Sequence, residues 1–154
     1  MECYSRFYVG GGIEGMGVTI SSKRYSCDMG YSGFNRFRQV VADKVNNEFA
    51  DHYKELASID VIMLGGEKRK EYFEKYDAKT IEFVNSNVIT AEVANFLYQS
   101  DCTGKIDRKQ AKEIYELIKD CDDNIIFGYT GRKDCAKMYD MKNIFSDRTK
   151  VEWC

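Results

Sequence analysis

Proline is absent from the sequence, and histidine occurs once, as His52. Without proline, turns have to be made by glycine, asparagine, aspartate or serine. A zinc site usually combines cysteine and histidine ligands at short spacing, and the sequence contains no Cys-x-x-Cys pair. We therefore expect no metal site and no other cofactor.

The sequence also lacks a strong excess of one charge and a long apolar run. Its 23 basic and 25 acidic residues give a net charge of −2, so an extended basic face for duplex DNA is not expected. No apolar stretch approaches the roughly 20 residues of a membrane-spanning helix. The first residues also lack the apolar segment of a secretory signal. We predict a cytoplasmic protein that binds neither membranes nor duplex DNA.

Six cysteines are present, a number that would fit a disulfide framework in a secreted protein. A cytoplasmic chain keeps its thiols reduced, so we interpret these residues mainly as small buried hydrophobic groups. Hydrophobic residues make up 44% of the sequence and aromatic residues 14%, which is enough for a packed core and argues against disorder. The length predicts a single domain spanning residues 1–154.

The N-terminal part of the chain predicts a β-hairpin. Residues 3–9 alternate like a strand, residues 10–17 form a glycine-rich loop, and residues 18–21 form a second strand. The loop contains the pattern G-x-G-x-x-G, but a β-branched segment follows where a dinucleotide fingerprint requires a helix. We expect residues 151–154 to pack on this hairpin, because Trp153 has no other obvious way to be buried.

Periodic apolar residues predict helices after the hairpin. The first begins within Tyr31–Arg38 and turns Phe34 toward the core. Arg36 and Arg38 fall off the apolar stripe, so we expect them to lie in solvent; the alternative is a contact with an anion or a partner beside the hairpin. The segment Ile59–Leu64 is expected as a strand or a buried connector. Further helices are expected at residues 49–56, 67–76, 90–97, 107–118 and 135–145. The predicted fold class is α+β, with the N-terminal β-hairpin packed on a bundle of about five helices.

The segment Ser100–Asp107 has the most distinctive turn chemistry in the chain. Gly104 can adopt a positive φ without steric cost, and Asp107 can cap the next helix, with Gln110 completing a capping box. The segment is similar to the middle of a calcium loop, but the first acidic ligand and the final glutamate are missing. We interpret it as a structural corner between two helices.

Three segments carry a resemblance to a group of proteins. Tyr31–Arg38, Ser100–Lys105 and Gly128–Ala136 together resemble small uncharacterised proteins of bacteria and their phages. In that group a Ser/Asn-Phe-x-x-Phe/Trp-Arg helix start precedes a Ser-Asp-Cys-Asp-Gly turn. Thr103 replaces the second aspartate of the turn here, which weakens a metal role. The resemblance implies a phage-type origin, and a phage-encoded protein would act in the host cytoplasm. The resemblance carries no known activity.

The functional hypothesis follows from missing catalytic signatures together with this resemblance. With no recognisable nucleophile elbow or ligand spacing, we expect no catalytic residues and a non-enzymatic protein. Our first hypothesis is a phage-type accessory protein that counters host defence by sequestering a nucleotide-like signal molecule, in a pocket between protomers of a homo-oligomer. The candidate ligand-binding residues, beside helix starts that favour anions, are Tyr31, Asn35, Arg36 and Arg132. The alternative is a protein–protein inhibitor or adaptor of a host defence complex, for example an anti-CRISPR protein; a third reading is a structural accessory protein.

Overall fold

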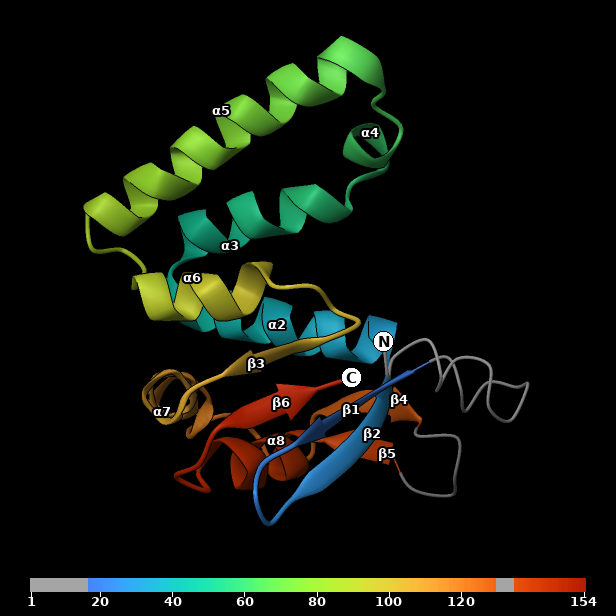
Figure 1. The fold of residues 1–154 in the computed structure, drawn as a ribbon, viewed down its shortest axis with the longest axis vertical. Helices are drawn as coiled ribbons and strands as arrows, with labels where there is room; N and C mark the ends of the chain where they lie inside the picture. Colours follow the sequence, from blue (N-terminus) through green and yellow to red (C-terminus); the bar gives the residue numbers. More distant parts are fainter. Residues whose placement is uncertain (1–16, 130–134) are drawn as a thin grey trace.

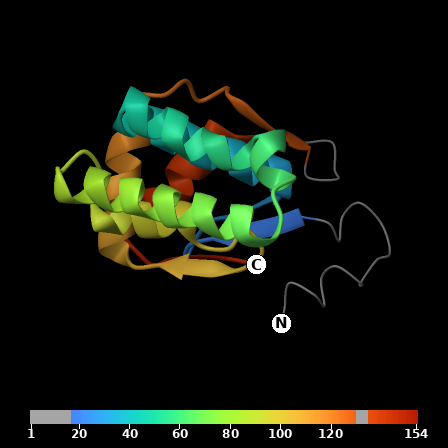
Figure 2. The same ribbon diagram turned by 90° about the horizontal axis from the view of Figure 1, so that it is seen from above.

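The computed structural model describes residues 17–129 and 135–154, which form an α+β fold (Figure 1 and Figure 2). This confirms the predicted class and the expectation that a β-hairpin precedes the helices, although the observed hairpin pairs β1 with β2. The strands are β1 (Gly17–Ser21), β2 (Ser26–Gly30), β3 (Gly104–Ile106), β4 (Ile126–Tyr129), β5 (Cys135–Lys137) and β6 (Val151–Trp153). The helices are α2 (Tyr31–Val45), α3 (Asn47–Lys54), the 3-10 turn η2 (Glu55–Ala57), α4 (Ile59–Ile62), α5 (Gly66–Asn85), α6 (Ala91–Tyr98), α7 (Arg108–Ile118) and α8 (Met138–Phe145).

The main sheet is antiparallel and has the strand order β2–β1–β6–β3. The predicted strand at residues 18–21 is confirmed as β1, and its hairpin partner is β2. The other strand expected for the hairpin, at residues 3–9, lies outside the described residues. Val18 and Ile20 of β1 are buried, whereas Thr19 donates a hydrogen bond of 2.5 Å to Asp28 of β2 on the opposite face. This alternation places one face of the sheet against the helices.

The C-terminal strand β6 lies between β1 and β3, which confirms that the end of the chain packs on the hairpin. Ile20 and Gly104 are the neighbours of Trp153 on the two sides. The Trp153 side chain is 2% exposed, and its Nε1 donates to the carbonyl oxygen of Ser100 at 2.9 Å. Both the apolar ring and the single N–H of this residue are therefore satisfied.

Gly104 differs from its predicted role. The backbone there is extended strand, and the positive-φ residues of the described chain do not include it. A Cβ at Gly104 would lie 2.5 Å from Cε2 of Trp153, so glycine is needed for close approach to the indole and not for a turn. The predicted capping box is confirmed: Asp107 accepts from Gln110 N at 2.8 Å, and Gln110 accepts from Asp107 N at 3.1 Å.

Helix α2 lies at the centre of the hydrophobic core and contacts β4, β6 and α8. Phe37 stands 5.5 Å from Phe127 of β4 and 5.5 Å from Phe145 of α8, measured between ring centroids. Phe34 stands 5.5 Å from Trp153 of β6. These rings come from segments far apart in the sequence. Burial of α2 therefore brings the main sheet, β4 and α8 into one core.

The segment Ile59–Leu64 is neither a strand nor a buried connector. Residues 59–62 form the short helix α4, capped by Ser58, whose side chain accepts from Val61 N at 3.3 Å. Val61 is buried, but Ile59 and Ile62 are 75% and 60% exposed. Four helical residues can turn few side chains toward the core, so most of this apolar run faces outward. Figure 1 shows α4 beside the start of α5, which is the outermost helix of the helical side.

Candidate functional site

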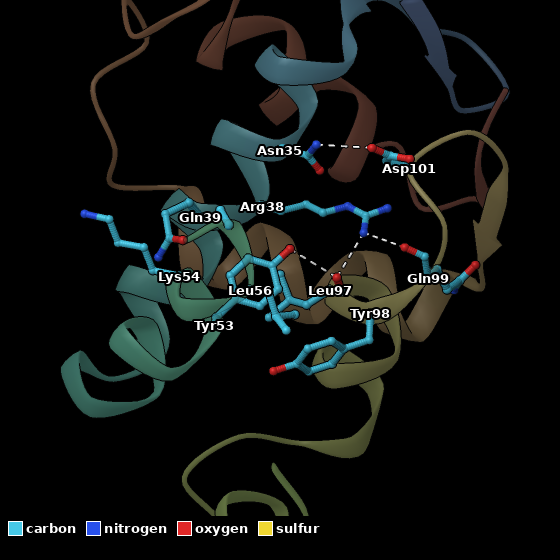
Figure 3. Close-up of a pocket in the computed structure, with 11 residues that line it drawn as sticks. Asn35, Arg38, Gln39, Tyr53, Lys54, Leu56, Leu97, Tyr98, Gln99 and Asp101 are labelled. Atoms are coloured by element: carbon cyan, nitrogen blue, oxygen red, sulfur yellow. Dashed lines mark hydrogen bonds between the residues drawn. The ribbon is translucent and has the colours of Figure 1, made fainter. Parts of the chain in front are cut away.

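A cavity of about 440 Å³ opens between α2, α3 with η2, and the end of α6 (Figure 3). We call it the Arg38 pocket. Its lining residues are Asn35, Arg38, Gln39, Tyr53, Lys54, Leu56, Ala57, Leu97, Tyr98, Gln99 and Asp101. The volume lies in the range of small-molecule sites. The lining combines charged, amide and phenol groups with a few apolar side chains, which suits recognition of a polar ligand.

Arg38 is buried at the wall of this pocket, so the prediction that it lies in solvent is wrong. Its side chain follows Phe34 by one helical turn, and the residue is 3% exposed. Nη1 donates to the carbonyl oxygens of Leu97 at 2.9 Å and Gln99 at 2.6 Å, and Nη2 donates to that of Ser100 at 3.0 Å. The guanidinium carbon lies 4.5 Å from the Phe34 ring centroid. Arg38 therefore holds the segment after α6 against α2.

The charge of Arg38 is compensated mainly by carbonyl dipoles. Within the described parts of the chain, it forms no ion pair with a carboxylate, and its buried Nε has no hydrogen-bond partner. Burial lowers the pKa of Arg38, and the nearby Tyr53 and Asp101 oppose that shift. A guanidinium remains charged in proteins, and a buried charge without a counter-ion is unfavourable. The pocket wall therefore attracts anions.

Polar groups from α2, α3 and the segment after α6 surround the Arg38 guanidinium. Tyr53 donates to the Leu97 carbonyl at 3.1 Å, and burial raises the pKa of Tyr53, which keeps the phenol protonated. Asn35 donates to the Asp101 carboxylate at 3.2 Å. The exposed Lys54 adds a second positive charge at the rim. Hydrogen-bonding groups and two cations thus converge on one cavity that holds a single carboxylate among its described lining residues.

The structure brings one of the predicted ligand-binding residues to this pocket. Asn35 lines it, whereas Tyr31 is half-buried and packs on the core. Arg36 is exposed and points toward β4, with its Nη2 3.7 Å from the position that a Cβ on Gly128 would take. Arg132 lies outside the described residues.

Sequence reasoning missed most of the remaining lining residues. Arg38 follows Phe34 by four positions and so shares the buried stripe of α2, a spacing that could have revealed it. Tyr53 lies in the helix expected at residues 49–56, and the sequence pattern does not mark it as a site residue. Asp101 belongs to the corner interpreted as structural. No local pattern links these residues, because the pocket joins segments about 60 positions apart, as the contact from Arg38 to Leu97 shows.

A second basic hollow, of about 390 Å³, lies between α7 and the segment after α8. It is lined by Arg108, Lys112, Tyr115, Glu116, Phe145, Ser146 and Arg148. Its three cations are exposed. Water screens the charge of an exposed cation. An exposed cation therefore attracts an anion less strongly than a buried cation does. This hollow is a useful comparison site for the Arg38 pocket.

Among the residues that the structure describes, no group of three or more His, Cys, Asp and Glu side chains could hold a metal ion. Nor does any helix in residues 17–129 and 135–154 have the length and apolar character needed to cross a membrane. No family model, curated protein or solved structure matches the chain.

Proposed function

We propose that the protein binds and sequesters a small nucleotide-like anion in the Arg38 pocket, without catalysing its conversion. The observation that carries the proposal is the buried Arg38 guanidinium at the wall of a cavity, with no carboxylate ion pair among the described residues. An anion in the cavity would supply the missing counter-charge. In a partly desolvated site this attraction is stronger than in water.

The other lining groups favour a ligand with several hydrogen-bonding groups over a simple ion. The side-chain amides of Asn35, Gln39 and Gln99 and the phenol of Tyr53 lie around the same cavity. Such groups recognise hydroxyl, amide and ring-nitrogen atoms by direct hydrogen bonds. Phosphate, sugar and base together offer this combination. Sequestration requires these contacts and rigid walls, and it requires no nucleophile.

The proposal is tested by isothermal titration of the purified protein with cyclic nucleotides and ADP-ribose. We expect at least one of these probes to bind, and Lys54→Glu to weaken binding by roughly 2- to 30-fold, because an exposed attractive pair becomes a repulsive one. Lys44→Glu is the matched control, since Lys44 is exposed on α2 and does not line the pocket. Absence of binding for all probes, or equal loss in both variants, would refute the proposal.

The role against host defence rests on the resemblance to phage proteins and needs its own experiment. Bacterial cells that carry a nucleotide-signalled defence system would express the wild-type protein or Lys54→Glu before phage infection. If the protein removes the signal in the cytoplasm, the wild type should raise the number of plaques and the variant should raise it less. Equal plaque numbers with and without the wild-type protein would contradict this role.

A second candidate function, inhibition of a host defence protein by direct contact, is favoured by the apolar surface of α4. Ile59, Ile62 and Met63 are 75%, 60% and 77% exposed, and clustered apolar side chains often mark protein contacts. This function predicts that a purified host nuclease or receptor co-elutes with the protein in gel filtration at a fixed ratio. Ile62→Glu should abolish co-elution while leaving nucleotide binding intact.

A further inference from the structure

A third cavity, of about 450 Å³, adjoins the Arg38 pocket. It is lined by Leu56, Phe73, Tyr76, Asp77, Thr80, Ile81 and Tyr98, and we call it the aromatic hollow. Leu56 and Tyr98 line both cavities. The two cavities differ in chemistry. The Arg38 pocket holds two cations, whereas the aromatic hollow has mainly apolar walls with a single carboxylate, that of Asp77, among its described lining residues.

Hydrogen bonds and ring stacking hold the wall of the aromatic hollow in place. The hydroxyls of Tyr76 and Tyr98 lie 2.8 Å apart in a hydrogen bond. The Tyr76 ring stacks on His52 with a centroid distance of 3.9 Å and an interplanar angle of 14°. Thr80 donates to the Tyr76 carbonyl at 3.1 Å and lies 2.8 Å from Nε2 of His52. A wall fixed in this way loses little conformational entropy when a ring packs against it.

A chain of contacts connects the buried cation to this wall. Arg38 and Tyr53 donate to the same acceptor, the carbonyl oxygen of Leu97, at 2.9 and 3.1 Å. The Tyr53 and Tyr98 rings are 5.5 Å apart, and the Tyr98 and Tyr76 rings are 6.2 Å apart. In Figure 3, Asp101 lies at one end of the pocket, Arg38 and Tyr53 lie between, and Tyr98 lies at the other end. The aromatic hollow thus extends the pocket at its Tyr98 end.

The rim of the aromatic hollow is also apolar. Ile81 of α5 is 57% exposed, although it lies on a helix whose outer positions are mostly charged or polar. A flat ring that entered the hollow would cover part of this side chain. Apolar burial and stacking do not depend on which hydrogen-bonding atoms the ring carries. The hollow therefore suits planar heterocycles in general.

We infer that the aromatic hollow is the subsite for the base of a nucleotide whose phosphate lies in the Arg38 pocket. This inference rests on the proposed function and specifies its ligand as one with an anion at one end and a planar ring at the other. The charges set the orientation: Arg38 and Lys54 attract the phosphate, whereas Asp77 repels it and accepts hydrogen bonds from an amino group on the ring.

The test compares adenosine monophosphate, ribose phosphate and adenosine in isothermal titrations with the full chain. Because base stacking adds affinity, we expect adenosine monophosphate to bind roughly 5- to 150-fold more tightly than ribose phosphate. Ile81→Glu should remove most of this advantage and leave ribose phosphate binding unchanged. Ala78→Glu, an exposed position of α5 that does not line the hollow, is the matched control and should change neither. Lys54→Glu should weaken both phosphate-bearing probes.

The outcomes separate this inference from the proposed function. If ribose phosphate binds in a Lys54-dependent way and adenosine monophosphate binds no better, the base subsite is refuted and the anion site stands. If adenosine binds as tightly as adenosine monophosphate and Lys54→Glu has no effect, the anion site is refuted. If Arg148→Glu abolishes phosphate binding while Lys54→Glu does not, the ligand occupies the second basic hollow and both proposals fail.

Discussion

Replacing Gly104 by alanine is expected to destabilise the protein through a clash in the core. The added Cβ would lie 2.5 Å from Cε2 of Trp153 and 2.7 Å from Oε1 of Gln99, both closer than van der Waals contact allows. The indole has little freedom to move, because Phe34 and Phe96 each stand 5.5 Å from it, measured between ring centroids. Relief of the clash therefore requires a shift of strand β3 or of the aromatic cluster.

The size of the effect follows from two opposing contributions. Overpacking a well-packed core costs about 1–3 kcal/mol, and replacing glycine by alanine inside a strand recovers about 0.5–1 kcal/mol. The net loss in the free energy of unfolding is at most about 2.5 kcal/mol and about 1.3 kcal/mol at the middle of both ranges. At an m value of about 2 kcal/mol/M, the middle value lowers the urea midpoint by about 0.6 M. Trp153 is the single tryptophan of the sequence, so its fluorescence reports unfolding at the site of the change.

The control for this experiment is Gly65→Ala. A Cβ at Gly65 meets no atom within 4 Å, and its φ of −135° is open to any residue. Gly65 is the N-cap of α5, where alanine is less favourable than glycine. This loss opposes the gain from a less flexible unfolded chain, so we expect a urea midpoint close to that of the wild type. If Gly104→Ala shows the wild-type midpoint as well, the close approach of Trp153 does not determine the residue at this position, and the reasoning is refuted.

Three further predictions concern titration and reactivity. Burial lowers the pKa of His52 below 6.5, so stability should fall as the pH drops below about 6.5, where the unfolded chain takes up the proton more readily; urea midpoints at pH 7.5 and 5.5 should differ less in His52→Gln. The pKa of Asp147 is about 2 in the folded protein, because hydrogen bonds from Arg24 and Ser22 outweigh the effect of burial. The Asp147 carboxylate should contribute its full share to the free energy of unfolding above pH 3.8, and this share should be lost as the pH falls toward 2. Asp147→Asn should therefore show a smaller acid-induced loss of stability over that range. Burial raises the pKa of Cys27 to about 12, so iodoacetamide at pH 8 should label the exposed Cys102 and leave Cys27 unmodified until the protein unfolds, as peptide mapping would show.

Local chemistry made several parts of the fold predictable from the sequence. The helix expected from residue 90 begins there, and the hydroxyl of Thr90 caps it by accepting from Val93 N at 3.2 Å. The capping box at Asp107, strand β1 and the burial of Trp153 were predicted for similar reasons. Caps, periodic burial and turns act over a few residues, so the pattern that produces them can be read along the chain.

The candidate site was much less predictable. Of the four predicted ligand-binding residues, Asn35 lines the Arg38 pocket, whereas Tyr31 and Arg36 do not line it and Arg132 lies outside the described residues. The start of α2 therefore correctly indicated one pocket residue, Asn35. It could not identify the others, because adjacent positions on a helix point about 100° apart and only one of them faces a given cavity.

The sequence by itself determined the α+β class, the helical stripes, the capping box at Asp107 and the burial of the last strand, because each depends on interactions between near neighbours or on hydrophobicity. Only the tertiary structure decided the environment of Arg38 and Gly104. Arg38 is buried because the carbonyl groups of Leu97, Gln99 and Ser100 meet it, and Gly104 is confined by Trp153. Those partners lie about 50–60 residues away along the chain, where no local pattern can specify which side chains meet.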